Sequence, residues 1–174
     1  MTIGIIIVDH GSRRTQSNQM LENLAELFGR RFAERYPIVE PAHMELAEPT
    51  IATAYARCAH RGATRVVVAP YFLGPGKHWT QDIPRLTAEA AQQFPQTRYH
   101  VTQTLGIDDL ILDLLAMRIG NCEQHGFRCE VCLGTLRSGE ANIMIPQEEA
   151  SSHVTGEPKL CSTCPFKGQP LPAK

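Results

Sequence analysis

The stretch that decides the fold is Ile3-Gly4-Ile5-Ile6-Ile7-Val8, which Asp9-His10-Gly11-Ser12 follows directly. A continuous run rich in β-branched residues is typical of a strand that is buried on both faces. Residue types that favour turns come next, and they predict the end of the strand. The stretch therefore predicts a buried strand that runs towards a polar turn containing a histidine.

Helical and strand patterns alternate outward from this stretch. Helices show apolar residues at three- and four-residue spacing, and the strongest of the later strands is Arg65-Val66-Val67-Val68-Ala69-Pro70. Pro49 suits the first turn of a helix, and the glycines and prolines at 74–76 predict a long functional loop over residues 71–82. The predicted strands cover residues 3–8, 38–44, 65–70 and 98–103, and the predicted helices cover residues 17–35, 49–61, 84–94 and 108–125.

Strands that are separated by helices predict an α/β fold with a four-stranded parallel sheet flanked by helices, because right-handed crossovers place helices on both faces. We assign residues 1–120 to this domain. Residues 121–174 form a cysteine-rich C-terminal tail, and its polar, aperiodic stretch beyond Gly134 predicts a flexible linker and partial disorder.

The charge balance argues against two classes of partner. The 174 residues carry 17 Lys plus Arg and 18 Asp plus Glu, which gives a net charge of −1. No field of one sign favours nucleic acid or a membrane surface.

The apolar run at residues 3–8 is far shorter than the roughly 20 residues of a membrane-spanning helix and does not resemble a signal peptide. We expect a soluble cytoplasmic protein, or one of the chloroplast stroma if a transit peptide was removed.

Candidate functional residues follow the predicted strands. Ligands of open parallel sheets bind beyond the carboxyl ends of the strands. His10 follows the first strand, His43 and Glu45 follow the second, and His78 lies in the loop after the third. Imidazoles and a carboxylate on one edge could hold a divalent metal, and a neutral imidazole could accept a proton. Each histidine could equally be a hydrogen-bonded structural residue.

Basic and hydroxyl side chains accompany these residues. Ser12, Arg13, Arg14 and Lys77 could bind carboxylates, or could simply be exposed on a helix start and a loop. The Gly74-Pro75-Gly76-Lys77 stretch lacks the spacing of a phosphate-binding loop, which disfavours a nucleotide site. Trp79 could stack on a flat ligand or pack inside the fold.

Three motifs resemble one family. They are Val8-Asp9-His10-Gly11-Ser12-Arg13, then the segment from Glu40 to Pro49, and Gly74-Pro75-Gly76-Lys77-His78-Trp79-Thr80-Gln81-Asp82-Ile83-Pro84. In this order and spacing they resemble the short class II chelatases, and within these the sirohydrochlorin ferrochelatases of sirohaem synthesis. The resemblance covers about the first 120 residues.

The resemblance implies a reaction and an assembly. It implies insertion of Fe²⁺, the substrate metal, into sirohydrochlorin with release of two protons, and Co²⁺ insertion as the sister activity. It also implies a homodimer of flavodoxin-like half-chelatase units. His10 and His78 match the family's metal-handling histidines, and Glu45 matches its acidic position. The carboxylate arms of the substrate would explain Ser12, Arg13, Arg14 and Lys77.

The tail carries two Cys-x-x-Cys pairs. Cys129 with Cys132, and Cys161 with Cys164, could together bind zinc or an iron–sulfur cluster, or remain reduced thiols. Resemblance to the plant-type ferrochelatases implies a [2Fe–2S] cluster on Cys122, Cys129 and Cys132, with the later pair as further candidates. Three functions therefore remain open: a ferrochelatase, a cobaltochelatase, and a non-catalytic metal or iron–sulfur binding module. The rim motifs favour the ferrochelatase.

Overall fold

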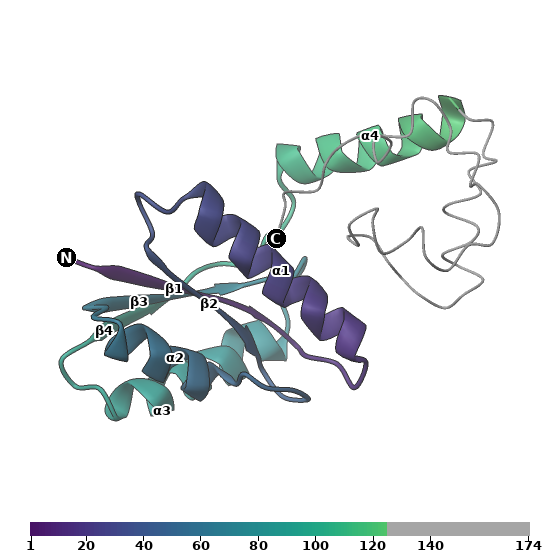
Figure 1. Cartoon of the computed structure of the whole chain (residues 1–174). Helices are drawn as coiled ribbons and strands as arrows, with labels where there is room; N and C mark the ends of the chain where they lie inside the picture. Colours follow the sequence, from purple (N-terminus) through teal and green to yellow (C-terminus); the bar gives the residue numbers. More distant parts are fainter. Residues whose placement is uncertain (125–174) are drawn as a thin grey trace. The chain divides into compact units, whose positions relative to one another are not determined.

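The computed structural model describes residues 1–124 and contains a four-stranded sheet in the order β2-β1-β3-β4 (Figure 1). All neighbouring strands are parallel. The strands are β1 (Ile3–Asp9), β2 (Ile38–His43), β3 (Arg65–Pro70) and β4 (Arg98–Val101). The predicted α/β fold class is confirmed. The predictions for the linker and for the cysteines at 129, 132, 161 and 164 lie outside the described residues.

The sheet belongs to a compact unit that covers Met1–Ile107. Helix α4 (Asp109–Gln124) belongs to a second unit that begins at Asp108. The predicted domain boundary after residue 120 stays a prediction. Among the described residues, no helix is both long enough and apolar enough to cross a membrane.

Helices cover both faces of the sheet, as predicted. Helix α1 (Thr15–Arg31) lies on one face, and α2 (Ile51–His60) and α3 (Ile83–Gln92) lie on the other (Figure 1). Consecutive side chains of a strand point to opposite faces. Ile5 and Ile7 of β1 accordingly join one apolar cluster with Leu21, while Ile6 and Val8 join a larger cluster on the α2 side. This alternation explains why the run in β1 has no polar position.

The amino end of β1 is closely packed. Gly4 lies against Cys58 of α2, and a Cβ atom on Gly4 would come within 3.0 Å of both Cβ and Sγ of Cys58. Cys58 is fully buried, and this burial, with a smaller effect from the nearby Glu40 carboxylate, raises the pKa of its thiol to about 12. The thiol is therefore a protonated packing group.

The predicted start of the second helix is wrong by two residues. The helix begins at Ile51, and Thr50 is its N-cap, with the Thr50 hydroxyl accepting a hydrogen bond from the Thr53 amide. Pro49 stays outside the helix, because its carbonyl oxygen accepts a hydrogen bond from the His43 amide at 2.7 Å. The capping hydroxyl and this bond to the strand end outweigh the preference of proline for a first turn.

The predicted loop over residues 71–82 is also shorter than expected. Residues His78–Asp82 form a π-helical turn, η1, that continues into α3. The Thr80 amide and hydroxyl both donate to the Gly76 carbonyl oxygen at 3.0 Å, and the Ile83 amide donates to that of His78. His78 therefore lies on a helical turn rather than in an irregular loop.

Candidate functional site

The ends of β1 and β2 bring two predicted site residues together. The strands are in register to Asp9 and His43, and the pairing continues as the Glu45 amide donates to the His10 carbonyl oxygen at 3.2 Å. The side chains then meet, with His10 Nε2 3.7 Å from Glu45 Oε2. Both side chains are about half exposed, at 40% and 50%. The prediction that they share the carboxyl edge of the sheet is confirmed.

His78 reaches the same place from the other side of β1. Its ring lies 5.0 Å from the His10 ring, centroid to centroid, in an edge-to-face arrangement at 72°. Its Nδ1 lies 3.0 Å from Asp82 Oδ2, one helical turn further on. We call His10, Glu45, His78 and Asp82 the rim cluster.

The bond to Asp82 indicates the tautomer of a neutral His78. His78 Nδ1–H donates to the Asp82 carboxylate, so its Nε2 carries the lone pair and could bind a metal ion or accept a proton. His10 has an oxygen acceptor near each ring nitrogen: the Gly11 carbonyl lies 3.3 Å from Nδ1, and Glu45 Oε2 lies 3.7 Å from Nε2. The two imidazoles and the Glu45 carboxylate thus form a partly exposed polar group at the rim.

The rim cluster is not a closed metal centre. Among the side chains that the structure describes, no three of His, Cys, Asp or Glu lie close enough together to hold a metal ion. His10 is near both Glu45 and His78, but the three side chains do not surround one point. The cluster therefore offers an open and incomplete set of donors.

His43 lies at the carboxyl end of the second strand, as predicted, but its side chain is not open to the rim. It is the last residue of β2 and is fully buried, with Nδ1 2.6 Å from Asp9 Oδ1. Its Nε2 is buried and has no hydrogen-bond partner among the described residues. His43 is therefore not available as a rim ligand, because its side chain is buried against Asp9 and the turn of Gly11.

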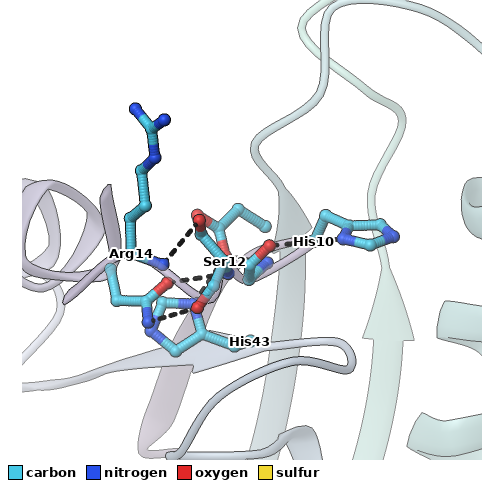
Figure 2. A network of polar contacts seen from close by, with 7 residues as sticks. His10, Ser12, Arg14 and His43 are labelled. Atoms are coloured by element: carbon cyan, nitrogen blue, oxygen red, sulfur yellow. Dashed lines mark hydrogen bonds and ion pairs between the residues drawn. The ribbon is translucent and has the colours of Figure 1, made fainter. Parts of the chain in front are cut away.

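The candidate carboxylate-binding residues lie beside the rim cluster in sequence and are mostly exposed. Ser12 is half-buried, and its hydroxyl accepts a hydrogen bond from the Arg14 amide at 3.1 Å. Arg13, Arg14 and Lys77 are exposed and form no salt bridge with any residue in the described part of the chain. In Figure 2 the Arg14 guanidinium and the His10 ring both point away from the hydrogen-bonded turn. The turn itself is rigid, because Asn18 bonds both the amide and the carbonyl of Ser12.

Two carboxylates at the site were missed at the sequence level. Asp82 lies four residues after His78, a spacing that brings side chains together on a helix, but the segment was interpreted as a loop. Asp9 is predicted only as a turn residue, although it is the last residue of β1 and directly precedes His10. Trp79 is half-buried, and its indole N–H donates to the Thr102 carbonyl oxygen at 3.0 Å.

Residues 4–122 match the sequence profile of the CbiX family. The chain belongs to the CbiX family. It is 53% identical over 136 residues to "Sirohydrochlorin ferrochelatase, chloroplastic" of Arabidopsis thaliana, covering 76% of this chain and 60% of that protein. It is 45% identical over 82 residues to the sirohydrochlorin cobaltochelatase of Methanocaldococcus jannaschii, covering 47% of this chain and 56% of that protein.

The CbiX fold of the described unit agrees with a solved structure. The structure of SirB from Bacillus subtilis with Fe³⁺ matches with a TM-score of 0.60 at 33% identity, covering 68% of this chain and 46% of that chain. The chain thus spans between 46% and 60% of the length of these three relatives. The resemblance to the short class II chelatases is confirmed at the level of family and fold.

Proposed function

We propose that the chain is a sirohydrochlorin ferrochelatase, which inserts Fe²⁺ into sirohydrochlorin to form sirohaem. The ion enters with two positive charges, and two pyrrolic protons leave, so charge balances. The 53% identity to a protein named as this enzyme supports the substrate and the metal. The catalytic and metal-handling residues would be His10, His78 and Glu45.

The observation that carries this proposal is the pair of imidazoles next to a carboxylate at the rim. A metal in transit must be held weakly enough to be released, and the pyrrolic nitrogens must lose protons as it enters. The open donor set suits weak holding, because a macrocycle can supply the missing ligands. Nε2 of His10 or His78, or the Glu45 carboxylate, could hold the ion or accept a proton.

Substrate binding would fall to Ser12, Arg13, Arg14 and Lys77. Sirohydrochlorin carries carboxylate arms around its ring, and guanidinium groups bind carboxylates with two hydrogen bonds. Since these cations have no salt-bridge partner among the described residues, their charges are available to a ligand.

We further propose a homodimer. The chain covers 46% of the SirB chain, and its compact unit carries one rim cluster. Two copies would supply two rims to one macrocycle. Light scattering of the purified protein should give twice the chain mass, and a monomer that inserts metal would overturn this part.

The tail would bind a [2Fe–2S] cluster that the reaction does not use. Five cysteines from residue 122 onward offer thiolates, the ligands such a cluster requires: Cys122, Cys129, Cys132, Cys161 and Cys164. Zinc has the same requirement and is the competing prediction. Anaerobically purified protein should be coloured and contain inorganic sulfide, and colourless protein with one zinc and no sulfide would decide for zinc.

A cobaltochelatase is the second candidate, because the M. jannaschii relative carries that name at 45% identity. A non-catalytic binding module has less support, because it does not explain why the side chains of the rim cluster lie together.

Separate anaerobic reactions of the purified protein with sirohydrochlorin and either Fe²⁺ or Co²⁺ would test these functions. The absorption spectrum of the macrocycle changes when a metal enters. We expect faster insertion of Fe²⁺ than in protein-free controls. Faster Co²⁺ insertion would favour the second candidate, and no acceleration with either metal would overturn both.

A further inference from the structure

The buried pair of His43 and Asp9 has no assigned role in the proposed reaction. His43 has no exposed surface, and its Nδ1 lies 2.6 Å from Asp9 Oδ1. The other ring nitrogen, Nε2, is buried without a hydrogen-bond partner among the described residues. A buried polar atom without a partner is unfavourable, so a residue that serves only packing would be apolar. The bond from its Nδ1–H to Asp9 is the one contact of the described residues that offsets this cost.

The Asp9 carboxylate connects this imidazole to the turn that carries His10. Oδ1 of Asp9 accepts the Nδ1–H of His43 and also the Gly11 amide, which lies 2.9 Å away. These bonds belong to the network drawn in Figure 2. Both donors bond the same oxygen. The buried His43 therefore fixes the Asp9 carboxylate, and the carboxylate in turn fixes the Gly11 amide.

Gly11 allows the turn after His10 to pack closely against His43. Its φ is +81°, a conformation that glycine adopts easily and other residues rarely do. A Cβ atom there would lie 3.0 Å from the Cβ of His43, so the turn packs directly against the base of that side chain. Nothing bulkier than glycine fits between the two.

We propose that His43 is a positioning residue, which fixes the Asp9 carboxylate beneath Gly11 and thereby sets His10 at its distance from Glu45. Without the Nδ1–H donor, the carboxylate is free to turn towards solvent, where it is already 22% exposed. The Gly11 amide then loses its acceptor, and His10 loses its fixed place. The consequence for catalysis rests on the proposed function, but the positioning itself does not.

The test compares His43→Asn with His43→Leu. The amide nitrogen of Asn is as many bonds from the backbone as Nδ1 of histidine, so Asn keeps the donor, whereas Leu fills the space without it. Tyr55→Phe is the matched control, because it removes another buried side-chain bond, from Tyr55 to Thr97 at 2.7 Å, near the amino end of β4. The readouts are hydrogen exchange of the Gly11 amide, followed by NMR, and kcat and KM for Fe²⁺ insertion.

We expect faster Gly11 exchange in His43→Leu, with kcat lower by about 10- to 100-fold, the range for residues that orient a ligand, and with little change in KM. His43→Asn and Tyr55→Phe should stay near wild type in both readouts. Unchanged Gly11 exchange in a folded His43→Leu protein would overturn the proposal, and so would equal losses in the Leu and Asn variants. If the wild type inserts no metal, the proposed function fails, while Gly11 exchange still decides the positioning role.

Discussion

The two ends of β1 share one strand but have opposite properties. At the amino end, a Cβ atom on Gly4 would lie within 3.1 Å of Cys58 and Ala63, and both of these residues are buried. At the carboxyl end, the chain leaves the sheet into the turn of His10, whose side chain is 40% exposed and lies beside Glu45. The amino end, called the closed end below, supplies apolar packing. The carboxyl end at the rim presents polar side chains that are partly exposed.

This difference separates stability from chemistry along a single strand. Substitutions at the closed end should alter the free energy of unfolding and leave catalysis intact, and substitutions at the rim should do the reverse. Variants that break this separation would show that the two ends are coupled.

The largest effect should come from the rim histidines. Replacing His10 or His78 by Ala should lower kcat for Fe²⁺ insertion by about 100-fold or more, as loss of a positioned base or ligand does. The free energy of unfolding should change by less than about 0.5 kcal/mol, because both side chains are partly exposed. An anaerobic insertion assay and urea unfolding measure the two quantities. His60→Ala, an exposed histidine at the end of α2, is the control and should leave kcat unchanged.

The closed end should give the opposite result. Gly4→Ala places a Cβ atom 3.0 Å from Cβ and Sγ of Cys58 and should destabilise the fold by about 1–3 kcal/mol. Gly29→Ala is the matched control, because its Cβ would meet Val39 at an ordinary 3.5 Å, and it should be neutral or stabilising. Urea unfolding gives both values. A folded Gly4→Ala protein with reduced kcat would contradict the separation of the two ends.

A single contact inside the rim cluster should have a smaller effect. Asp82→Ala removes the acceptor that holds His78 Nδ1–H, and should lower kcat by about 10-fold, the lower limit for such orienting carboxylates. Asp82→Asn keeps an oxygen at that place and should recover most of the rate. Equal rates for the Ala and Asn variants would mean that the carboxylate does not orient His78.

The sequence was sufficient for the fold and for the grouping of His10, Glu45 and His78, because both follow from local patterns. The run in β1 favours a strand buried on both faces, and parallel strands bring the residues after them to one edge. His10, Glu45 and His78 could therefore be grouped without coordinates. The resemblance to the chelatases rests on the same local motifs.

The direction of individual side chains could not be predicted in this way. His43 lies within both the predicted and the observed second strand, but the pattern of residue types does not show that its side chain is buried against Asp9. Likewise, the bond between His78 and Asp82 depends on the π-helical turn, which forms through bonds to the Gly76 and His78 carbonyls. Neither is visible in residue types alone.

The pH dependence of the free energy of unfolding tests the burial of the Cys58 thiol at the closed end. The thiol of Cys58 has a pKa of about 12 when folded, against an ordinary value of 9.0. Above pH 9 the unfolded chain releases this proton and the folded chain keeps it, so its contribution to stability is complete below pH 9 and is lost as the pH rises towards 12. The loss is at most about 1.4 kcal/mol per pH unit. Urea unfolding from pH 8 to 10.5 should therefore show a smaller decline in Cys58→Ala than in wild type, and parallel declines would contradict the burial of the thiol.

The smallest effects should come from the exposed cations beside the rim. If Arg13 and Lys77 bind the carboxylate arms, Arg13→Gln or Lys77→Gln should raise KM for sirohydrochlorin by roughly two- to five-fold with kcat unchanged, because an exposed ion pair contributes less than about 1 kcal/mol. Added salt should raise the wild-type KM in the same direction, since it screens charges over roughly 8–10 Å. Arg85→Gln removes an equal charge from α3, where Arg85 already pairs with Glu89 at 2.8 Å, and should leave KM unchanged. A KM that rises equally in all three variants would point to the overall charge of the protein. A KM independent of salt would instead assign the arms to neutral donors, of which the Ser12 hydroxyl in the same turn is the nearest candidate.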